Sequence, residues 1–240
     1  MAKKYESDII IIGGGVGGLI CGAILAKKGY SITLCDANAQ LGGSLQVFSR
    51  EKTVFDSGVH YLGGLSEGEN LYQVFKYLDV LKSLDIDQMN TSGFEEYHFG
   101  ATKQTYKIPQ GWQNFEQQLI SYFPDETDSI QRYVKDVQHC CQQFKLYNLE
   151  YEANEQPKLG LQSLSLDQYL QQLTPNKTLQ KVLSGNALLY ASGKSSTPFH
   201  LHALTINSYI TGAYKLVNSG AQLTKALRKV IRTNGGQIVL

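Results

Sequence analysis

The residues best suited to chemistry lie near the N-terminus, in a run of glycines. Gly13, Gly15 and Gly18 have the spacing G-x-G-x-x-G. Gly13 permits a sharp turn from a strand into a helix, Gly15 lets the backbone approach a pyrophosphate, and Gly18 lets the helix pack closely on the strand. Free N–H groups and the dipole at the helix N-terminus favour an anion. The spacing therefore predicts a site for the pyrophosphate of a dinucleotide.

An acidic residue follows at the distance that such a site requires. Asp36 stands at the end of a predicted strand at 31–35 and comes 18 residues after Gly18. A carboxylate at this position accepts hydrogen bonds from an adenosine ribose. It suits NAD or FAD and disfavours a 2′-phosphate.

Three elements must position these residues. The run 8–12 is apolar on both faces and predicts a fully buried parallel strand. Residues 19–28 predict a helix that ends at Gly29, and residues 31–35 predict a second strand. Strand, glycine turn, helix, strand and acid occur in the order of a dinucleotide-binding α/β unit.

The next segment bears on which dinucleotide is bound. A Rossmann unit for NAD normally runs from its second strand into another crossover helix. Here the chain has a second glycine pair, Gly42 and Gly43, followed by two short predicted strands at 45–49 and 53–55. This extended stretch favours FAD over NAD.

At this point the sequence resembles a known family. The glycine motif, Asp36, L-G-G at 41–43 and F-D-x-G-x-H-Y at 55–61 resemble FAD-dependent flavoproteins of the amine-oxidase type. The most similar branch is the phytoene desaturase, carotenoid isomerase and retinol saturase group. The resemblance is densest over 8–64 and returns at 212–214 and 220–223.

The resemblance implies a fold and a reaction. The fold would be α/β, a Rossmann-like FAD-binding domain (1–85 and 212–240) with an inserted α+β substrate domain at 86–211. Because the resembling proteins are longer, we expect a chain truncated at its C-terminus, an N-terminal fragment that is inactive alone. The reaction would be hydride transfer between flavin and an apolar, polyene-like substrate such as a carotenoid or retinoid.

The resemblance also implies site residues. The loop at 58–61 would pass near the flavin, which makes His60 and Tyr61 the candidate catalytic residues, although a structural role for His60 is an equal alternative. Many relatives have Glu where Asp36 stands, and Arg or Lys where Ser44 stands. The cofactor-binding residues would be Gly13, Gly15, Gly17, Gly18, Asp36, Gly42, Gly43, Ser44, Gly58 and Val59.

Three alternatives stay open. The first is an NAD-dependent dehydrogenase, which the second glycine pair and the missing crossover helix argue against. The second is a non-catalytic binding protein on the same fold, similar to the escort proteins of prenylated GTPases. The third is an inactive remnant of the enzyme.

Composition narrows the remaining classes. The net charge is +1, which gives no electrostatic case for binding nucleic acid or an anionic membrane. The 4 cysteines have no metal-ligand spacing, and His200 with His202 has no further ligand nearby, so no metal is expected. Cysteine usage fits a reducing cytoplasm. Any peripheral contact with a membrane would go through parts that this chain lacks.

Periodicity predicts the rest of the chain. Apolar spacing of three and four residues predicts helices, and the alternation at 103–108 predicts the second strand of a hairpin. Ser165 and Gln168 form a predicted capping box. The expected helices are 69–81, 112–123, 125–149, 177–191, 199–210 and 219–234, with a hairpin at 94–100 and 103–108, a loop at 150–164 and a final strand at 237–240.

Overall fold

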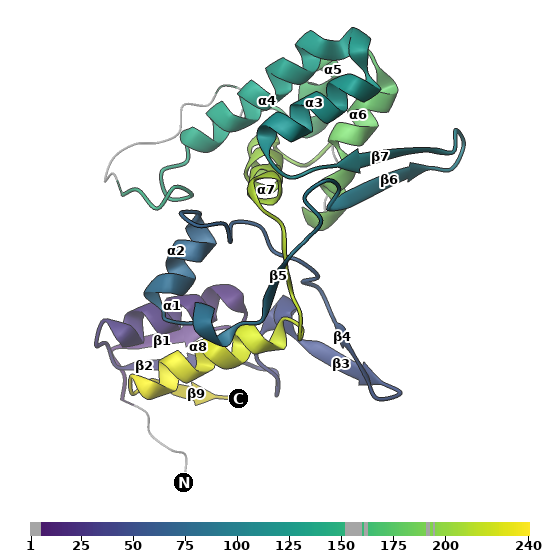
Figure 1. Ribbon diagram of the computed structural model, residues 1–240. Helices are drawn as coiled ribbons and strands as arrows, with labels where there is room; N and C mark the ends of the chain where they lie inside the picture. The colour runs from purple at the N-terminus through teal and green to yellow at the C-terminus, as the bar shows by residue number, and fades with distance from the viewer. Residues whose placement is uncertain (1–5, 152–159, 161–162, 191–192, 194) are drawn as a thin grey trace. The chain divides into compact units, whose positions relative to one another are not determined.

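The structure is a computed structural model that describes residues 6–151, 160, 163–190, 193 and 195–240 (Figure 1). The chain forms two compact units. Unit 1 comprises the described residues of Met1–Leu62, Leu71–Asp87 and Tyr214–Leu240. Unit 2 comprises those of Gly63–Asn70 and Gln88–Ala213.

Unit 1 is built on a parallel sheet with the order β1-β2-β9. The strands are β1 (Ile9–Ile12), β2 (Ile32–Cys35) and β9 (Gln237–Val239). In register, Ile9 pairs with Ile32 and Thr33 with Gln237. Helix α1 (Val16–Lys27) connects β1 to β2, as parallel pairing requires, and α8 (Ala221–Thr233) precedes β9.

Helices α1 and α8 pack together because glycine leaves room between them. A Cβ at Gly22 would lie 3.2 Å from Cδ1 of Ile231 on α8 and 3.3 Å from Cδ1 of Ile11 on β1. The apolar stripe of α8 is buried through Leu223, Ala226, Leu227 and Ile231. These contacts confirm the strand–turn–helix unit expected for the first 36 residues.

The prediction that β1 is fully buried is wrong. Ile10 is 66% exposed and Ile12 is 90% exposed, whereas the next strand contains Leu34 at 0%. The burial of β1 alternates, and β1 is an edge strand of the sheet. An apolar run on both faces predicts burial only when both faces are covered, and here one face of β1 is open.

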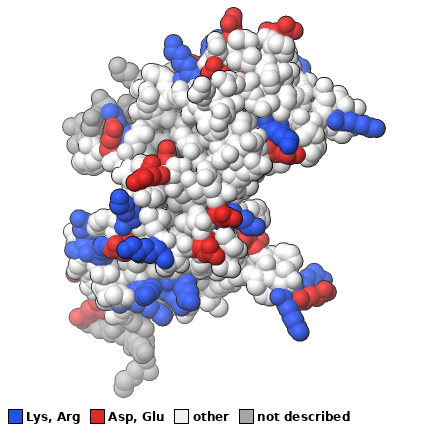
Figure 2. All heavy atoms as spheres, in the orientation of Figure 1, with Lys and Arg blue, Asp and Glu red and all other residues white. Residues whose placement is uncertain are grey.

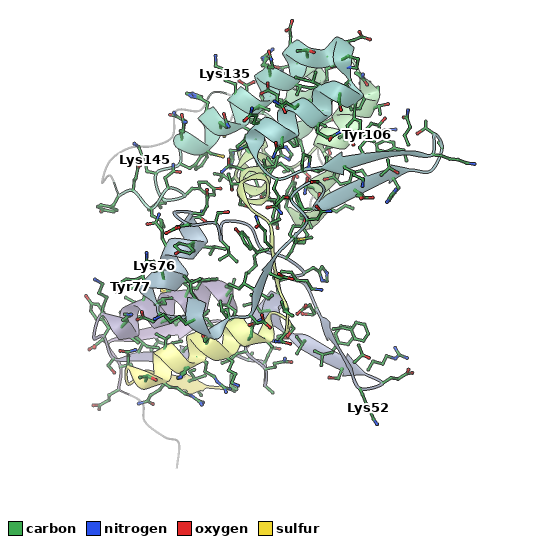
Figure 3. The ribbon with its side chains drawn as sticks, viewed as in Figure 1. Lys52, Lys76, Tyr77, Tyr106, Lys135 and Lys145 are labelled. Atoms are coloured by element: carbon green, nitrogen blue, oxygen red, sulfur yellow. The ribbon has the colours of Figure 1, made fainter. Side chains whose placement is uncertain are left out.

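Two short strands follow β2, as the sequence predicts, and they pair as a hairpin. Strands β3 (Val47–Arg50) and β4 (Thr53–Asp56) are antiparallel, and the hairpin projects from the sheet of unit 1 (Figure 1). Glu51 and Lys52 form its tip with positive φ angles of 50° and 65° (Figure 3). Unit 1 is completed by most of α2 (Asn70–Tyr77) and by β8 (Tyr214–Leu216), which pairs with β5 (Ile86–Gln88).

Unit 2 is mainly helical. Its core contains the fully buried rings of Tyr133, Tyr169 and Phe199. The capping box between Ser165 and Gln168 is present. Its elements are β6 (Glu95–Phe99), β7 (Gln104–Ile108), α3 (Trp112–Tyr122), α4 (Thr127–Gln142), α5 (Leu166–Leu173), α6 (Lys177–Leu183) and α7 (Phe199–Thr211).

Several helix ends differ from the predicted ones. Helix α2 is shorter than the predicted 69–81, and α4 ends at Gln142 rather than at 149. The helix expected at 177–191 is divided: α6 ends at Leu183 and a 3₁₀ segment runs over Gly185–Tyr190. A Cβ at Gly185 would lie 2.3 Å from the ring of Tyr97, so this position requires a glycine. The close approach of the Tyr97 ring occurs where the helix is divided. The predicted loop at 150–164 lies largely outside the described residues.

Among the residues that the structure describes, no helix is both long and apolar enough to span a bilayer.

Candidate functional site

The glycine turn between β1 and α1 has the geometry that its spacing predicts. Gly13 has a φ of 108°, which permits the turn, and a Cβ at Gly18 would lie 1.9 Å from the carbonyl oxygen of Gly13. Cβ atoms at Gly15 and Gly17 would meet nothing within 4 Å. Gly13 and Gly18 therefore serve the fold, and Gly15 and Gly17 leave open space at the start of α1.

The start of α1 is suited to an anion. Gly15 caps the helix without a side-chain hydrogen bond, and the first turn contains no acidic residue. The N–H groups of this turn have no partner within the helix. Their partial positive charge attracts a phosphate.

Asp36 lies directly beside this turn. One carboxylate oxygen accepts a hydrogen bond from the backbone N–H of Gly14 at 2.6 Å, and the other accepts from the N–H of Asn38 at 2.8 Å. These backbone hydrogen bonds, first from Asn38 and then from Gly14, lower the pKa of Asp36. The carboxylate is therefore ionised and fixed at the end of β2, where a ribose would be recognised.

The second glycine pair meets the first. The N–H of Gly42 donates to the carbonyl of Gly14 at 2.8 Å, and a Cβ at Gly43 would lie 3.2 Å from Cα of Gly15. Gly42 and Gly43 have φ angles of 116° and 55°, a region that favours glycine. The two glycine segments thus present bare backbone side by side.

The predicted segment at 58–61 contacts the second glycine segment through Ser44, the residue after Gly43. The N–H of Val59 donates to the carbonyl of Ser44 at 3.0 Å, and a Cβ at Gly58 would lie 3.1 Å from Cβ of Ser44. The structure therefore brings together the ten residues that the sequence predicts as cofactor-binding, although they come from four separate parts of the chain: 13–18, Asp36, 42–44 and 58–59.

The predicted catalytic residues lie on the irregular segment that follows. His60 is exposed and Tyr61 is half-buried. Val59 is held by Ser44, and Leu62 exchanges two backbone hydrogen bonds with Tyr214 at 2.7 and 2.8 Å. The backbone around His60 and Tyr61 is thus fixed at both ends.

Asp56 forms a long-range hydrogen bond. Short acidic side chains often form hydrogen bonds within their own loop. The carboxylate of Asp56 instead accepts from the N–H of Gly220 at 2.8 Å, at the N-terminus of α8. Asp56 therefore ties the hairpin β3–β4 to a segment 164 residues away.

Sequence analysis missed Thr224 on α8. A Cβ at Gly42 would lie 2.7 Å from its hydroxyl oxygen, so α8 packs directly against the second glycine pair. This hydroxyl is buried and makes no hydrogen bond within the described residues. No local motif marks Thr224, because its position depends on the pairing of β9 with β2.

Sequence analysis also missed a buried histidine in unit 2. His202 on α7 lies between two hydroxyls, with Nε2 2.7 Å from Tyr133 and Nδ1 2.6 Å from Tyr190. Burial lowers the pKa of His202 to about 3 and raises that of Tyr133. The histidine is neutral, so one hydroxyl donates to the ring and the other accepts from it. The described residues contain no group of three or more His, Cys, Asp or Glu side chains that could hold a metal ion.

The two adjacent cysteines are structural. Cys140 and Cys141 are free and buried in α4. Burial raises the pKa of Cys140 to about 11 and that of Cys141 to about 12. Neither forms a reactive thiolate at neutral pH.

Comparison with known proteins agrees with this geometry. Residues 11–78 match the family model described as NAD(P)-binding Rossmann-like domain. All-trans-retinol 13,14-reductase from Danio rerio is 26% identical over 98% of this chain and 41% of its own length. Prolycopene isomerase 2 from an Oncidium hybrid cultivar is 29% identical over 65% of this chain and 26% of its own length.

Solved structures share the fold. Putrescine oxidase, solved with putrescine bound, superposes with a TM-score of 0.64 at 13% identity, covering 98% of this chain and 51% of that structure. The chain thus spans about half of that protein and about 40% of the retinol reductase. It has a Rossmann-like α/β fold, and it resembles the N-terminal part of retinol 13,14-reductases and prolycopene isomerases, as its motifs predict.

Proposed function

We propose that this chain binds FAD and is part of an oxidoreductase that transfers hydride between the flavin and an apolar, polyene-like substrate. One observation carries the cofactor assignment: three glycine-containing segments present bare backbone at the N-terminus of α1. The contact of Gly43 with Gly15 is the centre of that arrangement.

The described residues fit this cofactor. The open space at Gly15 and Gly17 would receive the pyrophosphate, and Asp36 would accept hydrogen bonds from the adenosine ribose. The Asp36 oxygen that accepts from Gly14 has a further lone pair for a ribose hydroxyl, whereas the other oxygen already accepts from both the backbone N–H and the side-chain amide of Asn38. The buried hydroxyl of Thr224, which has no partner among the described residues, is a further polar group beside Gly42.

FAD rather than NAD is favoured by the chain after β2. No helix separates β2 from the hairpin β3–β4; the chain instead makes a short 3₁₀ turn over Gly43–Leu45 and enters β3. The NAD-dependent alternative would use that space for a crossover helix. The segment that contains Gly42, Gly43 and Ser44 is therefore available to lie along a second phosphate group.

The proposed substrate class is supported by the names of the relatives. Their names describe the reduction of retinol and the isomerisation of a carotene, and both substrates are apolar polyenes. Bound FAD would supply hydride transfer. His60 and Tyr61 would orient the substrate or the flavin ring, because the backbone on each side of them is fixed.

We also propose a division of labour along the chain. Residues 1–85 and 212–240 would bind the cofactor, and residues 86–211 would contribute to the substrate side. A reducing cytoplasm is the proposed location, which the free cysteines Cys140 and Cys141 support.

A titration of FAD fluorescence tests the cofactor assignment. Gly15→Ala adds a Cβ only to open space, so it should leave the fold intact and weaken quenching by the chain. Gly100→Ala is the matched control, since a Cβ at Gly100 also meets nothing within 4 Å. Equal quenching by the Gly15 variant would refute the proposal. Competition by NAD⁺ at the same concentration would favour the dehydrogenase.

A further inference from the structure

The outer face of α8 has a concentrated positive charge. Lys225, Arg228, Lys229 and Arg232 are all exposed, and their spacing of three and four residues places them on one side of the helix. Over this span a helix rises about 10 Å. Helix α8 buries its apolar face in unit 1, and because it contains no acidic residue, every charged side chain on its outer face is cationic.

This basic face, defined as these four residues, is not explained by stability. None of the four makes an ion pair with a described residue, whereas Lys27 nearby is paired with Asp79. Lys225 with Lys229 and Arg228 with Arg232 are like-charge pairs four residues apart, an arrangement that destabilises a helix. A net charge of +1 for the whole chain conceals this local excess.

A hollow lies beside the basic face in unit 1. It has a volume of about 350 Å³ and is lined by Lys27, Asp79 and Lys229, with Leu78, Val80 and Val230 among its apolar walls. Figure 2 shows blue side chains gathered over α8 and the adjoining part of unit 1. Lys27 and Lys28 also lie over the ring of Tyr77, which is 41% exposed at the end of α2 (Figure 3).

We infer that the basic face of α8 docks on an anionic membrane surface. Four or more cations on an amphipathic helix attract the headgroups of acidic phospholipids, and each adds to the affinity. Nucleic acid fits less well, because α8 carries no aromatic residue on which a base could stack. The choice of a membrane as the partner rests in part on the proposed function, since an apolar polyene partitions into lipid. The positive charge of α8 is observed independently of that function.

Vesicle co-sedimentation of the 240-residue chain tests the inference. The chain should sediment with vesicles of phosphatidylcholine mixed with phosphatidylserine, remain in solution with phosphatidylcholine alone, and be released by added salt. The variant Lys225→Gln/Arg228→Gln/Lys229→Gln/Arg232→Gln should bind the acidic vesicles about tenfold more weakly or worse.

A second variant separates position from total charge. Lys52, Lys103, Lys135 and Lys181 are exposed and make no ion pair with a described residue, so replacing these four by Gln removes the same charge from scattered sites. This control should bind as the unmodified chain does. If the α8 variant melts at a lower temperature, the pair Lys225→Gln/Arg232→Gln is used, with a smaller loss expected.

Four outcomes would overturn the inference: no binding of the unmodified chain, equal binding to both kinds of vesicle, equal losses in the two variants, or tighter binding to duplex DNA than to vesicles. Displacement by inorganic phosphate beyond that caused by sodium chloride of equal ionic strength would indicate a small-anion site instead.

The quenching of FAD fluorescence is measured separately on the α8 variant. It should be unchanged, so failure of the membrane inference and of the cofactor proposal are distinguishable.

Discussion

The carboxylate of Asp36 accepts a hydrogen bond from the backbone N–H of Gly14 at 2.6 Å, across 22 residues of sequence. This contact joins the end of β2 to the glycine turn that follows β1. It holds the acid that we propose to bind the ribose beside the turn that we propose to bind the pyrophosphate.

Replacing Asp36 by Asn should weaken FAD binding while leaving unit 1 folded. The amide keeps one acceptor but loses the charge that makes hydrogen bonds from a ribose strong, so the affinity should fall about tenfold or more. Isothermal titration of the two proteins with FAD measures the change.

The pH profile provides a check on the same residue. Because backbone hydrogen bonds lower the pKa of Asp36, its carboxylate stays ionised at mildly acidic pH. Its stabilising contribution is complete above the unfolded value and is lost only as pH falls through the lower folded value. FAD affinity should therefore not decline through titration of Asp36 between neutral pH and its ordinary pKa of 3.8. If Asp36→Asn leaves the affinity for FAD unchanged, Asp36 does not bind the ribose.

Two adjacent glycines should respond oppositely to alanine. A Cβ at Gly18 would lie 1.9 Å from the carbonyl oxygen of Gly13, so Gly18→Ala should destabilise the chain by about 1–3 kcal/mol. A Cβ at Gly17 meets nothing, so Gly17→Ala should be neutral or stabilise α1 by up to about 1 kcal/mol. Urea denaturation of both variants measures the difference, and equal effects would contradict the close packing of α1 on β1.

The buried histidine should make unit 2 sensitive to mild acid. The folded pKa of His202 is about 3, below the ordinary value of 6.5, so the unfolded state binds more protons between these values. Stability should be flat above pH 6.5 and fall below it, by up to about 1.4 kcal/mol per pH unit from this group.

His202→Gln should be less stable than the unmodified chain at neutral pH, by about 1–3 kcal/mol, because the hydroxyls of Tyr133 and Tyr190 lose partners. It should also have a shallower slope between pH 6.5 and 5, a range above the ordinary pKa values of carboxylates. The measurement is urea denaturation at several pH values. Parallel slopes for the two proteins would show that His202 is not the titrating group.

The open face of β1 gives a test of the fold itself. Ile12 is 90% exposed, so Ile12→Ala should change the free energy of unfolding by less than about 0.5 kcal/mol in this chain. Leu34 on the adjacent strand is fully buried, and Leu34→Ala should cost about 2–5 kcal/mol. A large loss in both variants would show that the outer face of β1 is covered in solution.

Much of unit 1 follows from its sequence because its signals are local. The turn at Gly13 and the close approach at Gly18 depend on neighbours within a few residues, and the hairpin β3–β4 depends on its own pairing. The glycine segments were identified by spacing and resemblance, and the structure brings them together.

Other features could not be predicted because they depend on distant partners. The hydrogen bond between Asp56 and Gly220, the placement of Thr224 against Gly42, and the pairing of His202 with Tyr133 each join residues far apart in the chain. Burial was overestimated at Ile12 because a residue pattern does not show what covers a strand. The charge of α8 was hidden by averaging over the whole chain.

The most direct test of the central claim is an NMR titration of the ¹⁵N-labelled chain with FAD, which detects weak binding and locates it. The account predicts saturable shifts of the amide resonances of Gly14, Gly15, Gly43, Ser44 and Val59, with little change in unit 2 and no comparable shifts with NAD⁺. Unchanged amide resonances in these glycine segments at saturating FAD, or shifts confined to other parts of the chain, would contradict it.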